Sequence, residues 1–178
     1  MRMRKKKNLL PRMERCGAYQ IKDPYERKGR WHDLMPEAKE IRVELGCGKG
    51  RFTVETAAAE PDVLLIAVEK VPDAMVVAME RAAKAELHNV FFIDIDANQL
   101  PEIFDQGEVD RIYVNFCDPW PKKQPEAPPS DPRQFSQVLP AGAAYGRADS
   151  LQNRQRQAVP VVRGGDSPVW LYPVGGDP

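Results

Sequence analysis

Apolar residues recur along the middle of the chain in short runs, and amphipathic stretches separate these runs. The run VLLIAVE is almost continuously apolar, as expected for a strand buried on both faces of a sheet. Pro61 stops one intervening helix, and Asp73 is a candidate N-cap for the other. The pattern predicts strands at 41–45, 63–69, 89–96 and 109–116, and helices at 51–60 and 74–87.

This order of elements predicts an α/β fold with a parallel sheet. Strands that alternate with helices are typical of right-handed crossover connections. Ligands of such sheets bind beyond the carboxyl ends of the strands. We therefore looked for polar side chains and glycines where each predicted strand ends.

The two ends of the chain differ in composition from this middle part. The first thirty residues hold eleven Lys or Arg and three Asp or Glu, which suits a phosphate-binding arm or a solvated, frayed terminus. Residues 124–178 contain nine Pro and six Gly, a composition typical of low-complexity sequence. We therefore divide the chain into a basic N-terminal segment (1–40), an α/β core (41–123) and a low-complexity tail (124–178).

Cysteine and histidine content argues against a metal centre or a disulfide framework. Cys16, Cys47 and Cys117 lack CxxC spacing, and His32 and His88 are far apart in the sequence. We expect a reduced cytoplasmic protein without a metal. No apolar run is long enough for a signal peptide or a membrane span. The oligomeric state is not specified by any of these patterns.

The segment VELGCGKGRF is the first candidate binding element. Glu44 ends a strand, and Gly46, Gly48 and Gly50 follow before a helix, which leaves room for a ligand against the backbone. In a dinucleotide fingerprint the third glycine would fall one residue later, where this chain has Arg51. Glu44 would repel a pyrophosphate but suits the sulfonium and ammonium of S-adenosylmethionine. A purely structural glycine turn is the alternative.

Two further acidic residues follow predicted strands. Glu69 ends the second strand about 20 residues after the glycines and could accept hydrogen bonds from both ribose hydroxyls, as in NAD-binding proteins. Asp96 ends the third predicted strand and could receive the exocyclic amine of adenine. Asp94 competes for that role, and a helix cap is the alternative role for Asp96.

The segment NFCDPWPKK at 115–123 is the fourth candidate element. A strand delivers Asp118 to the ligand-binding edge, and Pro119, Trp120 and two lysines follow. Proline stiffens a loop, tryptophan offers a stacking surface, and the carboxylate can orient an amino group or ring NH. A turn with a packed tryptophan is the alternative.

The segments RMRKKK, KGRW, ELGCGKGRF, AVEK, DANQL and NFCDPWPKK together resemble the bacterial tRNA (guanine-N7-)-methyltransferase family, over residues 1–123. The resemblance implies a class I methyltransferase fold, S-adenosylmethionine as cofactor and tRNA as partner. It also implies that Glu44, Glu69, Asp96 and Asp118 contact the cofactor, that Asp118 is the catalytic residue and that Lys122 contacts the substrate. Guanine N7 carries no proton, so we interpret Asp118 as an orienting acceptor rather than a base.

The tail lacks two later motifs of that family, a basic run of the type R-H-x-K-R-R-L-T-H and an F-K-T-D-N stretch. Codons permitted for residues 151–156, read one nucleotide later, spell F-K-T-D-N. The same shift over 126–133 permits the end of the basic run. We therefore expect residues 124–178 to be an out-of-frame translation. The fourth strand would then be an unpaired edge, and the chain poorly soluble or marginally folded and unable to methylate tRNA.

Two other functions fit parts of the sequence. An NAD-binding oxidoreductase would use a similar sheet, but Glu44, the position of Arg51 and the lack of a candidate hydride-transfer acid disfavour it. A non-enzymatic cofactor- or RNA-binding remnant is consistent with the missing basic run.

Overall fold

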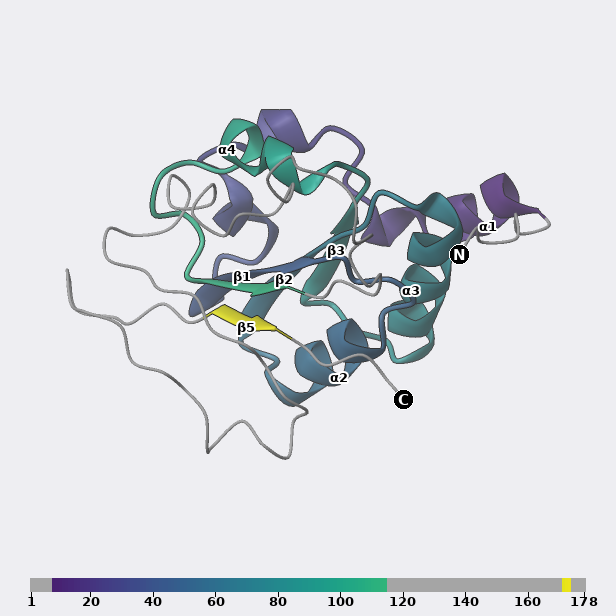
Figure 1. Cartoon of the computed structure of the whole chain (residues 1–178). Coiled ribbons are helices and arrows are strands. Elements are labelled where there is room, and N and C mark those ends of the chain that lie inside the picture. The colour runs from purple at the N-terminus through teal and green to yellow at the C-terminus, as the bar shows by residue number, and fades with distance from the viewer. Residues whose placement is uncertain (1–7, 115–170, 174–178) are drawn as a thin grey trace.

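The computed structural model describes residues 8–114 and 171–173 (Figure 1). Five parallel strands form one sheet in the order β3-β2-β1-β4-β5. The strands are β1 (Glu40–Leu45), β2 (Val63–Val68), β3 (Val90–Ile93), β4 (Arg111–Val114) and β5 (Leu171–Pro173). The α-helices are α1 (Leu9–Arg15), α2 (Arg51–Ala59), α3 (Pro72–Lys84) and α4 (Leu100–Ile103). The predicted parallel α/β sheet is confirmed.

Several element boundaries differ from the prediction, and α3 spans Pro72–Lys84 instead of residues 74–87. β3 ends at Ile93 instead of residue 96, because the chain leaves the sheet there and forms the 3₁₀ turn Ala97–Gln99. β4 begins at Arg111, two residues later than predicted. Asp73 is not the N-cap of α3: Val71 is, with Pro72 at the first helical position. The fixed φ of proline suits that position, and Asp73 in the first turn still complements the helix dipole.

The outer edge of β4 is paired, so the expectation of an unpaired fourth strand was wrong. β5 lies parallel to β4, with Ile112 opposite Leu171 and Val114 opposite Pro173. Three residues of extended chain are enough to pair with a strand that is itself only four residues long.

Side chains on the two faces of the sheet enter separate cores. Ile41, Val43 and Leu45 of β1 belong to the cluster that α4 and Trp31 cover. The opposite face packs under α2 and α3, with Leu65 and Ala67 of β2 among its buried residues. Arg42 and Glu44 alternate with the apolar residues of β1, so they point to this second face.

The segment before β1 is folded onto the sheet, which the sequence did not predict. Trp31 is fully buried, stacks on Phe104 with ring centroids 4.8 Å apart, and donates from Nε1 to the Ile103 carbonyl at 2.7 Å. Gln20 forms a parallel bridge with Phe92 of β3. Residues 8–39 therefore extend the core and the edge of the sheet.

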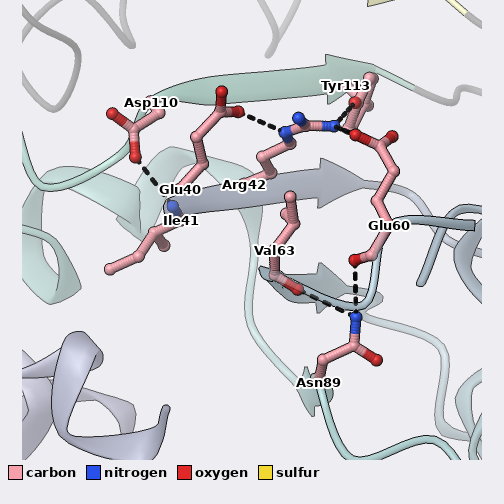
Figure 2. A network of polar contacts seen from close by, with 8 residues as sticks. All are labelled: Glu40, Ile41, Arg42, Glu60, Val63, Asn89, Asp110 and Tyr113. Carbon is pink, nitrogen blue, oxygen red and sulfur yellow. Dashed lines mark hydrogen bonds and ion pairs between the residues drawn. The ribbon is translucent and has the colours of Figure 1, made fainter. Parts of the chain in front are cut away.

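A buried arginine joins elements at the amino-terminal half of the sheet (Figure 2). The Arg42 guanidinium donates to a Glu40 carboxylate oxygen at 2.6 Å and to the Tyr113 hydroxyl at 2.9 Å, and it pairs with Glu60 at 2.7 Å. Burial alone would lower the Arg42 pKa, but Tyr113, Glu40 and Glu60 outweigh it and raise that pKa above its usual value. The network links β1, β4 and the end of α2.

Candidate functional site

The carboxyl edge of the sheet brings together residues from three separate strand ends. The Gly48 amide in the loop after β1 donates to Glu69, which follows β2, with N and Oε2 2.8 Å apart. Lys70 lies next along the chain, and its Nζ is 3.6 Å from Asp96 Oδ2 beyond β3. The structure thus places the predicted glycine loop, Glu69 and Asp96 along one continuous edge.

Glu44 is a fully buried carboxylate at the start of this edge. The Thr53 hydroxyl in α2 donates to Glu44 Oε2 at 2.6 Å, and Thr53 is itself fully buried. A buried carboxylate needs hydrogen-bond donors or positive charge, because isolated burial of a charge is costly. Glu44 is therefore positioned by α2 beneath the glycine loop and is suited to a cationic partner.

The glycine loop approaches α3 too closely for side chains. A Cβ built on Gly50 would lie 2.5 Å from the Ala78 Cβ and 2.7 Å from its Cα, and Gly50 has φ of +73°. Gly46 and Gly48 also have positive φ, a conformation that glycine adopts without a steric cost. Gly50 is thus required by helix packing, while Gly46 and Gly48 shape the turn.

Glu69 clamps the loop with both carboxylate oxygens. Oε2 accepts from the Gly48 amide at 2.8 Å, and Oε1 accepts from the Val71 amide at 2.9 Å. A carboxylate has about four lone-pair sites, so two backbone bonds leave acceptor capacity for hydroxyl groups. Glu69 thus holds the loop, and the predicted contact with a ribose stays compatible with that role.

Asp96 does not end β3 but lies three residues beyond it. Its Oδ1 accepts from the Asn98 amide at 3.0 Å, and the Gln99 side chain accepts from the Asp96 amide at 3.1 Å. This reciprocal capping box confirms the alternative role of helix cap. Contact with a cofactor remains a prediction for Asp96.

Asp94 follows β3 directly and lines a pocket at the outer edge of the sheet. Partial burial raises the pKa of its carboxyl group. Asp118 and Lys122, the predicted catalytic and substrate-binding residues, lie outside the described residues, as does Trp120.

The described part of the chain lacks two kinds of feature, a membrane-spanning helix and a cluster of metal ligands. No helix within 8–114 is both long and apolar enough to cross a membrane. In the same part of the chain no group of three or more His, Cys, Asp or Glu side chains is arranged to hold a metal ion.

The strand order, the glycine loop after β1 and the carboxylate after β2 together define a class I methyltransferase type of α/β domain. A solved structure titled as the antibiotic-resistance methyltransferase Kmr shares the fold, with a TM-score of 0.50 and 23% identity over 64% of this chain and 60% of that one. A family described as "Putative methyltransferase" matches residues 38–126, and the chain belongs to this family.

Curated relatives narrow the resemblance further. The tRNA (guanine-N(7)-)-methyltransferase of Geobacillus thermodenitrificans is 41% identical over 126 residues, which is 71% of this chain and 58% of that protein. The enzyme of the same name from Bacillus cytotoxicus is 40% identical over 70% of this chain and 57% of that protein. The family resemblance drawn from the motifs is confirmed. The chain spans somewhat over half the length of these relatives.

Two residues of the site were not identified from the sequence. Thr53 is one of several small residues in a helical segment, and nothing in the pattern marks it as the partner of Glu44. Lys70 stands beside Glu69 in AVEK, but its proximity to Asp96 depends on how the loops after β2 and β3 meet. The helical period of 51–59 does place Thr53 on the inward face, and that was the only available signal.

Proposed function

We propose that this protein transfers a methyl group from S-adenosylmethionine to N7 of a variable-loop guanine in tRNA. The observation that carries the proposal is the 41% identity to a relative named for that activity, over the part of the chain that forms the cofactor half of the fold. The buried Glu44 beside the glycine loop supports a cationic cofactor in preference to NAD. tRNA is the partner, and the cytoplasm is the compartment where the two would meet.

The described residues fit S-adenosylmethionine. Glu44 supplies a buried negative charge for the cationic end, the turn at Gly46 and Gly48 leaves the backbone open, and Glu69 keeps acceptor capacity for the ribose hydroxyls. Asp96 would face the adenine end. The cofactor supplies an electrophilic methyl group when bound. The chain contributes binding, orientation and exclusion of water.

The acceptor side of the reaction is assigned to residues after β4. Asp118 orients the guanine and faces the positive charge of the methyl donor, while Lys122 contacts the tRNA. Guanine N7 has an in-plane lone pair and no proton, so no group has to remove a proton before transfer. In-line alignment of the reacting atoms then accounts for most of the rate enhancement.

We also propose that residues 124–178 are translated one nucleotide out of frame. The family match ends at residue 126, close to where the composition changes. The chain as written would then bind cofactor but lack the basic run that grips RNA phosphates. A non-enzymatic cofactor-binding remnant is the second candidate function, and the missing basic run is the observation that favours it.

Two proteins test these proposals. One is the 178-residue chain, and the other is encoded by the same gene with the frame shifted by one nucleotide after codon 123. By calorimetry, both proteins should bind S-adenosylmethionine and neither should bind NAD. Labelled methyl groups should reach guanine N7 of unmodified tRNA only with the frame-shifted protein.

Three results would contradict parts of this account. Tighter binding of NAD would overturn the cofactor assignment. Methylation by the 178-residue chain would overturn the out-of-frame proposal. Cofactor binding by both proteins with no methylation by either would favour the non-enzymatic remnant.

A further inference from the structure

A pocket of about 360 Å³ lies at the outer edge of the sheet beside β3. Its volume falls within the range of about 300–1,000 Å³ that is common for small-molecule sites. Because Gln20 bridges Phe92 in parallel, the chain continues along β3 and brings Lys22 and Asp94 to the carboxyl end of the sheet. The pocket therefore opens at the same edge as the candidate cofactor site, beyond its β3 end.

Two opposite charges line this pocket without neutralising each other. Within the described part of the chain, neither the Lys22 ammonium nor the Asp94 carboxylate has a hydrogen bond or an ion pair. Both side chains are exposed to solvent on the lining of the pocket. Desolvation by the surrounding chain raises the pKa of Asp94, although the residue is exposed. The pocket thus offers a hydrogen-bond acceptor, Asp94, and a cation, Lys22, that are not paired with each other.

An aromatic ring and an amide complete the lining. The Tyr25 side chain is 47% exposed, and its hydroxyl accepts a hydrogen bond from Gln99 Nε2. That hydrogen bond fixes one edge of the ring and leaves the rest available for stacking. Stacking on an aromatic ring is a common way for proteins to hold an unpaired base.

We propose that this pocket binds a guanosine monophosphate unit, with Asp94 accepting from the base, Tyr25 stacking on it and Lys22 contacting the phosphate. Guanine is the base whose Watson–Crick edge presents two adjacent donors, N1–H and N2–H, which a carboxylate can accept together. Resting on the proposed function, we assign this unit to a second nucleotide of the tRNA. β2 and β1 separate β3 from β4, a span of about 14 Å, so this nucleotide is distinct from the one that Asp118 would orient.

Gln99 connects this pocket to the candidate cofactor site. Its Nε2 donates to the Tyr25 hydroxyl, while its Oε1 accepts from the Asp96 amide at 3.1 Å. One side chain therefore holds both the stacking surface and the cap around Asp96. A nucleotide that orders Tyr25 should also favour the arrangement of Asp96 that meets the adenine end.

Binding of free nucleotides to the 178-residue chain, with S-adenosylmethionine at saturation, tests the pocket. We expect guanosine monophosphate to bind at least about tenfold more tightly than adenosine monophosphate, the size of effect a bidentate base contact gives. Asp94→Asn should abolish this preference. Lys22→Met should weaken both nucleotides alike, because both carry the same phosphate. Glu14→Gln and Lys84→Met are matched controls that should change nothing, because both side chains are exposed and neither lines the pocket.

The source of the nucleotide is tested with single-stranded RNA that carries one guanosine, or inosine in its place. Tighter binding of the guanosine RNA than of free guanosine monophosphate supports the tRNA assignment, and equal binding overturns it. The pocket assignment is overturned if Asp94→Asn keeps the guanine preference, or if S-adenosylmethionine displaces the nucleotide. Intact cofactor binding in those experiments means that only this inference fails, whereas lost cofactor binding would count against the proposed function.

Discussion

Thr53 and Glu44 illustrate how one residue prepares another for a charged ligand. We expect Thr53→Val to lower the free energy of unfolding by about 1–3 kcal/mol, because the buried carboxylate loses a donor. S-adenosylmethionine should bind several-fold more weakly by calorimetry. Thr53→Ser keeps the hydroxyl and is the control. Equal affinity in the valine variant would show that Glu44 does not depend on this hydrogen bond.

Glu69 is predicted to hold the glycine loop and the ribose with one carboxylate. Glu69→Gln replaces one oxygen by an amide NH₂, which would face a backbone N–H instead of accepting from it. We expect S-adenosylmethionine affinity to fall roughly tenfold or more, measured by calorimetry. Glu55→Gln, in an exposed pair with Arg51, should leave affinity unchanged. A small effect at Glu69 would remove it from the proposed site.

Burial of Asp110 makes the stability of the folded protein depend on pH and sets the direction of that dependence. Burial raises the pKa of Asp110, although the Ile41 amide donates to it at 2.8 Å (Figure 2). The folded protein thus binds this proton more tightly than the unfolded chain. The resulting stability is present below about pH 4 and is lost as pH rises through the folded-state pKa.

Asp110→Asn should therefore flatten the change in stability between pH 4 and pH 7. Its oxygen can still accept from the Ile41 amide, so the fold should persist. Urea denaturation at several pH values would measure the difference. A variant with the same pH profile as the unsubstituted chain would contradict the assignment.

At the scale of elements, the contact between the glycine loop and α3 leaves no space for a methyl group. We expect Gly50→Ala to lower the free energy of unfolding by about 2–4 kcal/mol, through overlap with Ala78 and strain at positive φ. Gly17→Ala is the control, since no atom lies within 4 Å of its added Cβ. Urea denaturation of both variants would measure the contrast. Equal stability would mean that α3 can shift away from the loop at little cost.

The sequence predicted helices and strands well where the signal lay within the element itself or next to it. The apolar run at β2 and the helix stop before Pro61 are local signals, and both were confirmed. It failed where partners are distant in the chain. The burial of Trp31 depends on Phe104, far along the chain. The early end of β3 has a local cause, because the capping box between Asp96 and Gln99 competes with the strand. The site followed the same rule, because the strand-end carboxylates were recognisable but Thr53 and Lys70 were not.

At the scale of the whole molecule, β5 pairs with the outer edge of β4. Deleting residues 171–178 should leave the outer backbone groups of β4 unpaired. We expect faster aggregation at equal protein concentration, measured by light scattering. Deleting only residues 174–178, which keeps β5, is the control and should leave aggregation unchanged. Unchanged solubility after deletion would show that β5 does not protect this edge.

The pairing of β4 with β5 also sets an order of events during synthesis. Ile112 and its partner Leu171 are nearly sixty residues apart, so the other four strands leave the ribosome well before β5. At about 5–20 residues per second, the interval is roughly 3–12 s. For that time β4 lacks the partner strand that it has in the folded protein. The yield of folded protein should therefore depend on how fast the last third of the message is translated.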